Sequence, residues 1–294
     1  MRTLGDWPIE FEVLGNPAHP AIVLIMGLGM QLTSWPDAFC QMLVDAGYRV
    51  VRLDNRDSGL SARAPNGNYP GVLRVATATL LGLRVRTPYT LHDMAGDVVA
   101  VMDTLQIERA HVVGASMGGM IAQVLAAHYP QRVLSLTSIM SSSGNPRLPW
   151  PSRRARQVLL GRPANPQDAE SVVDHLVHVF AVIGSPAYPE PKEALRQRIR
   201  AGVQRAYVPT GTARQLLAVM ASGDRRKLLR SIAVPTLVIH GRDDPLVPLA
   251  AGQDTAAQVP GSSLLVMDGM GHDLPAALLP QIANAVLAHC GMAR

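Results

Sequence analysis

The sequence predicts an α/β fold built on a mostly parallel sheet that is flanked by helices. Continuous apolar runs, which are typical of strands buried on both faces, occur at residues 21–26, 111–114, 133–140 and 236–240. Segments with helical spacing alternate with them at residues 35–46, 91–105, 117–128 and 275–289. Parallel strands joined by crossover helices bring the loops at their carboxyl ends to one edge of the sheet, where catalytic groups can gather.

The N-terminal strand and the chain length complete this architecture. Residues 9–13 alternate apolar and polar side chains, as a half-exposed strand does. With 294 residues, of which 48% are hydrophobic, the chain can bury one large core. One domain that carries an insertion is therefore favoured over two independent domains.

A serine between two glycines marks the most distinctive turn of the chain. The segment Gly114-Ala115-Ser116-Met117-Gly118 follows an apolar run and precedes the helical segment 117–128. This context indicates a nucleophile elbow, in which a strained turn presents the hydroxyl at a helix N-terminus, where backbone N–H groups can stabilise an oxyanion. We therefore predict that Ser116 is a nucleophile.

A serine hydroxyl needs a base and an acid to attack at neutral pH, and two C-terminal loops can supply them. His272 follows the apolar segment 263–267 and precedes a helical segment, so we take it as the base. The loop after the strand at 236–240 carries two adjacent carboxylates, Asp243 and Asp244, and the acid lies there. None of the other histidines has the spacing of a metal site, so neither a metal nor a cofactor is expected.

With these residues the chain resembles the α/β-hydrolase superfamily over nearly its whole length, because the chain order serine, aspartate, histidine is that of the superfamily. The resemblance implies that Asp244 is the acid, since the family pattern has glycine, two residues and then aspartate, here beginning at Gly241. It also implies an oxyanion hole made by the backbone N–H groups of Leu28 and Met117. Family members usually carry histidine at the position of Met26, and that departure leaves open how the oxyanion loop is held.

Two further segments resemble the branch of the superfamily that includes aclacinomycin methylesterase. They are residues 24–37 and residues 54–61, and the second has Asp57 in the first glycine position of the commoner D-x-R-G-x-G-x-S pattern. The resemblance does not carry a substrate over, because pocket residues decide the substrate and scaffold motifs do not.

The regular alternation of strands and helices stops after residue 140. The following segment is rich in proline and has helix-like stretches at residues 152–160, 168–183, 191–206 and 212–221. We predict a hydrolase core of residues 1–140 and 232–294, with a helical cap of residues 141–231 inserted after the sixth strand. Apolar candidates for the substrate pocket, each of which could instead pack inside the protein, are Met140, Trp150, Phe180, Tyr188, Tyr207 and Met220.

Basic residues are concentrated in the predicted cap. Residues 141–231 carry fifteen Lys and Arg against six Asp and Glu, a net charge of +9, whereas the whole chain carries +5 and the remainder therefore −4. A solvated, arginine-rich surface accounts for this, and the alternative is a lid that attracts anionic amphiphiles or a membrane surface. Nucleic acid is not an expected partner, because the basic residues are not interleaved with stacking aromatics.

Composition favours a cytoplasmic protein. Residues 1–15 lack the charged start and apolar stretch of an export signal, and no apolar stretch is long enough to span a membrane. Cys40 and Cys290 are too few for a disulfide framework or a zinc site, so both are expected to be unpaired thiols. The sequence leaves the oligomeric state open.

These features predict a serine carboxylesterase that hydrolyses small to medium carboxylic esters, its small-molecule partners, through an acyl-enzyme intermediate. The same triad could act on another bond, as a C–C hydrolase, lactonase, amidase or cofactor-free perhydrolase. A ligand-binding protein on this fold that does not turn its ligand over is the remaining alternative, and a complete triad disfavours it. Haloalkane dehalogenation is disfavoured as well, because that chemistry uses an aspartate nucleophile.

Overall fold

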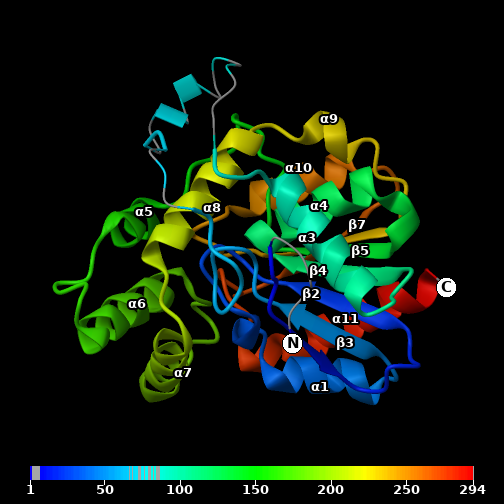
Figure 1. Cartoon of the computed structure of the whole chain (residues 1–294), viewed down its shortest axis with the longest axis horizontal. Helices are drawn as coiled ribbons and strands as arrows, with labels where there is room; N and C mark the ends of the chain where they lie inside the picture. Colours follow the sequence, from blue (N-terminus) through cyan, green and yellow to red (C-terminus); the bar gives the residue numbers. More distant parts are fainter. Residues whose placement is uncertain are drawn as a thin grey trace.

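A seven-stranded sheet runs through the centre of the molecule (Figure 1). The computed structural model describes residues 1, 7–65, 67, 69–71, 74–75, 77–78, 81, 83 and 87–293. The strands are β1 (Phe11–Leu14), β2 (Ala21–Ile25), β3 (Arg49–Leu53), β4 (Ala110–Ala115), β5 (Val133–Ile139), β6 (Thr236–Gly241) and β7 (Ser263–Met267). Their order across the sheet is β1-β3-β2-β4-β5-β6-β7, and only the β1–β3 pair is antiparallel among them. The predicted α/β class with a mostly parallel sheet is confirmed.

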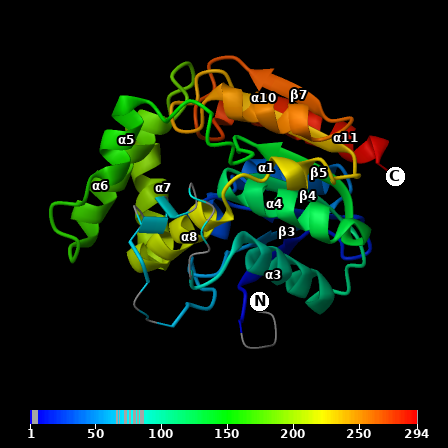
Figure 2. The same ribbon diagram turned by 90° about the horizontal axis from the view of Figure 1, so that it is seen from above.

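Helices cover both faces of this sheet (Figure 2). One face carries α1 (Asp37–Asp45) and α11 (Leu279–Met292), and the other carries α3 (Leu91–Thr104), α4 (Met117–His128), α9 (Arg226–Leu229) and α10 (Leu249–Gln258). Each layer has its own apolar cluster, with Phe39 and Ile282 in one, and Val98 and Ile121 in the other. Short 3₁₀ turns lie at Leu32–Ser34, Pro130–Arg132 and Ala276–Leu278. The buried sheet thereby holds its carboxyl-end loops on a rigid base.

Three elements of this core were not predicted: β3, α10 and the short helix α9, which falls within the residues expected to form the cap. Strand β3 escaped the search for apolar runs because Arg49 and Arg52 interrupt it. The Arg52 side chain is nonetheless buried, where its guanidinium bonds Glu12 Oε2 at 2.6 Å and Asp37 Oδ1 at 2.7 Å. Helix α10 is rich in alanine and polar residues, so it shows little apolar periodicity. Five strands precede the insertion in the described part of the chain, where the sequence predicted six; residues 2–6 lie outside that part.

Four helices follow β5 and lie to one side of the sheet (Figures 1 and 2). They are α5 (Arg153–Leu160), α6 (Ala169–Ile183), α7 (Lys192–Arg205) and α8 (Pro209–Ser222), each within a few residues of a predicted stretch. Side chains start two of them, since Ser152 accepts from the Ala155 N–H and Asp168 accepts from the Ser171 N–H. These helices form the inserted segment that we expected as a cap.

The two ends of the inserted segment lie side by side. Arg225 is buried, its Nη2 donates to the Ser142 carbonyl at 2.7 Å, and its backbone N–H donates to the Ser143 carbonyl at 2.9 Å. A Cβ at Gly144 would stand 2.0 Å from the Gly223 carbonyl oxygen, so the backbones touch there. The chain therefore leaves the core and returns to it at nearly the same point.

Candidate active site

Ser116 occupies a strained turn between β4 and α4. Its backbone has φ 55° and ψ −119°, a conformation that residues other than glycine rarely adopt. A Cβ at Gly114 would lie 2.2 Å from the Gly118 carbonyl oxygen, and a Cβ at Gly118 would lie 2.0 Å from the Ile25 carbonyl oxygen. Both flanking positions therefore require glycine, because β2, β4 and α4 converge there without room for a side chain.

Neighbouring groups hold this turn in place. The Ser116 N–H donates to the Ile139 carbonyl at the end of β5 over 2.9 Å. The Ser141 hydroxyl donates to the Ser116 carbonyl over 2.7 Å. Hydrogen bonds on both sides of Ser116 thus maintain a backbone conformation that costs of the order of 1–3 kcal/mol.

The loops after β6 and β7 bring an aspartate and a histidine to this serine. His272 Nε2 lies 3.0 Å from Ser116 Oγ, and His272 Nδ1 lies 2.7 Å from Asp244 Oδ2. Asp244 Oδ1 accepts from the N–H groups of Leu246 and Val247 at 2.9 and 2.8 Å, so the carboxylate is fixed in direction. Since an ionised aspartate can only accept, the proton in the pair is on Nδ1, and Nε2 is left to accept from the serine hydroxyl.

The neighbouring carboxylate, Asp243, points elsewhere. It is exposed, and its Oδ2 accepts from the Gly269 N–H at 3.0 Å. Asp243 therefore ties the acid loop to the loop that carries His272, while Asp244 contacts the imidazole itself.

The C-terminal end of α6 supports the histidine loop. The His272 N–H donates to the Ile183 carbonyl at 2.8 Å, and the Gly271 N–H donates to Ser185 Oγ at 2.9 Å. Ser185 also bonds the Asp273 carboxylate, whose pKa is raised by burial. His240 lies next to Asp244, with 3.7 Å between Nε2 and Oδ2. Burial lowers the pKa of His240, whose Nε2 also lies 2.8 Å from the Val247 carbonyl oxygen. The inserted segment thus takes part in holding the loop that carries His272.

The two residues expected to form an oxyanion hole lie around Ser116. Met117 is the first residue of α4, so its N–H is among the first four amides, which have no acceptor within a helix. A Cβ at Gly27 would lie 3.1 Å from Ser116 Cβ, so the loop that carries Leu28 runs against the serine. Their role as oxyanion donors stays a prediction.

The six pocket candidates have different surroundings. Trp150 is 77% exposed, which does not fit the enclosed apolar pocket that we expected it to line. Phe180 lies on α6 and packs against the apolar clusters that this helix forms with α5 and with α7. Tyr207, just after α7, is 37% exposed. Met140 is buried at the end of β5, Tyr188 lies against Gly269 of the histidine loop, and Met220 is half-buried in α8. Met140 and Tyr188 adjoin loops that carry Ser116, Asp244 or His272, and Phe180 packs on the same apolar cluster as Leu246 of the Asp244 loop. Pocket roles remain predictions.

Sequence reasoning missed the polar residues with which the inserted segment holds the core loops. They include Ser185 at the histidine loop, and Arg205, Arg214 and Gln215 on α7 and α8. Their partners lie 86 to 186 residues away in the chain, so no local pattern could identify them. Asp57 was the one residue whose sequence position indicated such a contact, because a carboxylate in place of the glycine of the pattern needs a hydrogen-bond donor or a cation beside it. It adopts φ 66°, and Arg214 binds it through both carboxylate oxygens.

Three further observations concern the described part of the chain. It holds no group of three or more His, Cys, Asp or Glu side chains arranged to bind a metal ion. None of its helices combines the length and apolar character that crossing a membrane requires. Cys40 and Cys290 are free and buried within it, and burial raises the pKa of Cys40 to about 11 and that of Cys290 to about 12.

Comparison with known proteins identifies the family. Residues 20–275 match the family described as alpha/beta hydrolase fold. The chain belongs to the α/β-hydrolase fold family. Rhodomycin D methylesterase DauP of Streptomyces sp. (strain C5), an α/β-hydrolase relative, is 30% identical over 98% of this chain and 97% of its own. This is consistent with the resemblance to the aclacinomycin methylesterase branch.

Other α/β-hydrolase relatives have different names. The 3-oxoadipate enol-lactonase 2 of Acinetobacter baylyi is 26% identical over 90% of this chain and 87% of its own. Among solved structures, the enol-lactonase of Burkholderia xenovorans LB400 superposes with a TM-score of 0.73 at 24% identity, covering 97% of each chain. That structural likeness establishes the fold alone.

Proposed function

We propose that the protein is a serine hydrolase that cleaves carboxylic esters of small to medium size through an acyl-enzyme. The observation that carries this proposal is the hydrogen-bonded series from Ser116 through His272 to Asp244, mounted on a strained turn at a helix N-terminus. The relative named as a methylesterase, matched over 98% of this chain, supports an ester as the substrate.

Each group has a defined task in this reaction. Ser116 Oγ attacks the ester carbonyl while its proton passes to His272 Nε2, which then protonates the leaving alcohol. Water, deprotonated by the same nitrogen, attacks the acyl-enzyme and releases the acid and the free serine. Asp244 orients the imidazole and stabilises its charged form, and the N–H groups of Leu28 and Met117 bind the oxyanion in both steps.

A lactone is the second substrate class to consider. Its hydrolysis breaks the same acyl–oxygen bond, and a relative matched over 90% of this chain is named as an enol-lactonase. The triad alone does not distinguish an open-chain ester from a lactone, because the lactone ring changes the contacts with the pocket and leaves the chemistry at the carbonyl unaltered.

A panel of substrates tests the proposal. We expect the purified protein to hydrolyse aryl esters of acetate to decanoate with one preferred acyl length, and an aryl amide of that acyl group at least about 100-fold more slowly, because the amine is the poorer leaving group. A simple lactone measured beside them decides between the two ester classes. If no ester or lactone is turned over and a ligand still binds, the fold serves binding and not catalysis.

Two groups of arginines in the inserted segment differ in their partners. The α7 arginines Arg196, Arg198 and Arg200 all bind carboxylates within that segment. The segment 141–167, in contrast, contains five arginines and no acidic residue, and the structure pairs none of these arginines with a described carboxylate. Three of them, Arg153, Arg154 and Arg156, are exposed on α5.

Salt should therefore affect charged substrates selectively. We expect kcat/KM for an anionic ester to fall about tenfold between low salt and about 0.5 M, since steering by unpaired surface charges is screened. A neutral ester of the same size should change little. Replacing Arg153, Arg154 and Arg156 with Gln should remove the salt response, whereas the same change at Arg196, Arg198 and Arg200 should preserve it. Equal salt responses for both esters would mean that this basic surface takes no part in substrate capture.

A further inference from the structure

The loop expected to supply one oxyanion donor is a tight turn that rests on α8. The Met30 N–H donates to the Gly27 carbonyl at 3.2 Å, and Gly29 has φ +68°, as the third residue of a type II turn does. A Cβ at Gly29 would lie 2.7 Å from Thr212 Oγ1. This oxyanion turn, residues 27–30, therefore presses directly against the inserted segment.

Gln215, one helical turn after Thr212, bonds the centre of the oxyanion turn. Its side chain is fully buried, and its Oε1 accepts from the Gly29 N–H at 2.7 Å. Its Nε2 donates to the Arg56 carbonyl at 2.8 Å, which fixes the orientation of the amide. One side chain from α8 thus connects the oxyanion turn to the loop that follows β3.

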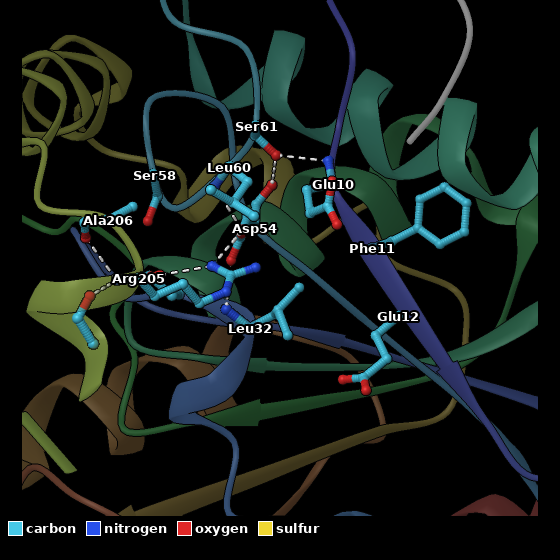
Figure 3. Close-up of polar contacts among 12 residues, drawn as sticks. Glu10, Phe11, Glu12, Leu32, Asp54, Ser58, Leu60, Ser61, Arg205 and Ala206 are labelled. Carbon is cyan, nitrogen blue, oxygen red and sulfur yellow. Dashed lines mark hydrogen bonds and ion pairs between the residues drawn. The ribbon is translucent and has the colours of Figure 1, made fainter. Parts of the chain in front are cut away.

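A second anchor lies at the far end of the same loop. Arg205 Nη1 donates to Gln31 Oε1 at 2.6 Å and to Asp54 Oδ2 at 2.8 Å, and Asp54 Oδ1 accepts from the Leu32 N–H at 2.7 Å (Figure 3). Gln31 Nε2 in turn donates to the carbonyls of Gly202 and Ala206, both at 2.7 Å. The oxyanion turn itself and the residues that follow it are therefore held by α8 and by residues at the end of α7.

The side chain that precedes the oxyanion turn gives no such support. Met26 has a thioether, which cannot donate a hydrogen bond and accepts only weakly. Only its backbone carbonyl takes part, by accepting from Asn55 Nδ2 at 2.8 Å. Polar side chains that fix this loop come instead from the loop after β3 and from the inserted segment.

We propose that Gln215 is a positioning residue that keeps the oxyanion turn in the conformation that presents the Leu28 N–H to the reacting carbonyl oxygen. The inference rests on the proposed function. Type I and type II turns differ in the orientation of the central peptide, which carries the Leu28 carbonyl and the Gly29 N–H that Gln215 binds. The Leu28 N–H belongs to the preceding peptide, one Cα away, so a fixed central peptide limits the backbone rotations at Leu28 that would move this N–H. Glycine tolerates both orientations, so the hydrogen bond and not the backbone selects one of them.

The test compares Gln215→Met with Arg214→Met. Methionine keeps the length of glutamine and loses both hydrogen bonds. Arg214 is the matched control, because it is buried on the same helix and bonds the same loop after β3 through Asp57, with Nη2 2.6 Å from Oδ1, while its partner is not in the oxyanion turn. Both variants should unfold at lower temperature, so lost stability alone cannot separate them.

Two measurements distinguish a positioning role of Gln215 from a contribution to stability alone. Amide hydrogen exchange of residues 27–32, which needs no turnover, should accelerate at least tenfold in Gln215→Met and remain unchanged in Arg214→Met. In Gln215→Met, kcat for an aryl ester should fall about 10- to 100-fold with KM within about threefold, a smaller loss than removing an oxyanion donor outright. The inhibition constant of an aryl trifluoromethyl ketone, whose adduct with Ser116 places an oxyanion in the hole, should rise by the same factor.

Three results would overturn the proposal: unchanged exchange in Gln215→Met, a loss confined to KM, or equal losses of kcat in both variants. Failure of the proposed function is distinguishable from these. In that case the wild-type protein neither hydrolyses the ester nor reacts with the ketone, and a faster exchange in Gln215→Met alone would still support the hydrogen-bonded anchor.

Discussion

Replacing Ser116 with Ala should abolish ester hydrolysis while leaving the protein folded. Loss of a triad nucleophile typically lowers kcat by about 10⁶-fold, because the base and the oxyanion donors then have no acyl acceptor to assist. Alanine keeps the Cβ and loses only the hydroxyl, whose hydrogen bond joins His272 Nε2 at 3.0 Å. Initial rates with the preferred aryl ester, measured beside the thermal unfolding temperature, check both expectations.

Covalent labelling gives an independent control for the same residue. A fluorophosphonate should modify the wild-type protein once, and peptide mass spectrometry should place the adduct on Ser116. The Ser116→Ala variant should remain unlabelled. An adduct on a different residue, or hydrolysis retained in the variant, would contradict the assignment of the nucleophile.

The second large effect concerns the adjacent carboxylates. Asp244→Asn should lower kcat on the order of 10⁴-fold, because an amide at 2.7 Å from His272 Nδ1 favours the wrong tautomer of the imidazole. Asp243→Asn should lose less than about tenfold, since an amide oxygen can still accept from the Gly269 N–H, the bond that Asp243 makes. Steady-state kinetics on both variants with one ester measures the difference.

These two variants serve as controls for each other, because they make the same change at neighbouring positions of one loop. Reversed losses would show that Asp243, and not Asp244, orients the histidine. Equal and small losses would show that neither carboxylate does so, and the base would then need another orienting group.

The fold and the proposed triad were accessible from the sequence because each depends on local patterns. Strands β2, β4, β5 and β6 are covered on both faces, so their apolar runs stand out. The glycines around Ser116 reflect a backbone so crowded that a Cβ would clash at 2.0 to 2.2 Å, and a constraint of that kind leaves a short motif. His272 follows β7, and the pair Asp243 and Asp244 follows β6, but the choice of Asp244 within that pair came from the family resemblance.

What the sequence did not disclose depends on contacts between distant residues. Gln215 and Gly29 are 186 positions apart, and nothing in the helical pattern of α8 distinguishes Gln215 from a solvated glutamine. Arg52 is a related case, since only its partners Glu12 and Asp37 explain a guanidinium inside a sheet. Pocket residues were selected by apolar character alone, and that criterion does not distinguish exposed Trp150 from buried Met140.

The adjoining ends of the inserted segment have an evolutionary consequence. Because the chain departs at Gly144 and returns at Gly223, where the backbones touch, segments of other lengths could be exchanged there without disturbing the strand order. Any such exchange would also remove Gln215 and Arg205, which hold the loop at residues 27–32. A transplanted segment would therefore have to bring equivalent anchors, because the loop would otherwise lose its hydrogen bonds to α7 and α8.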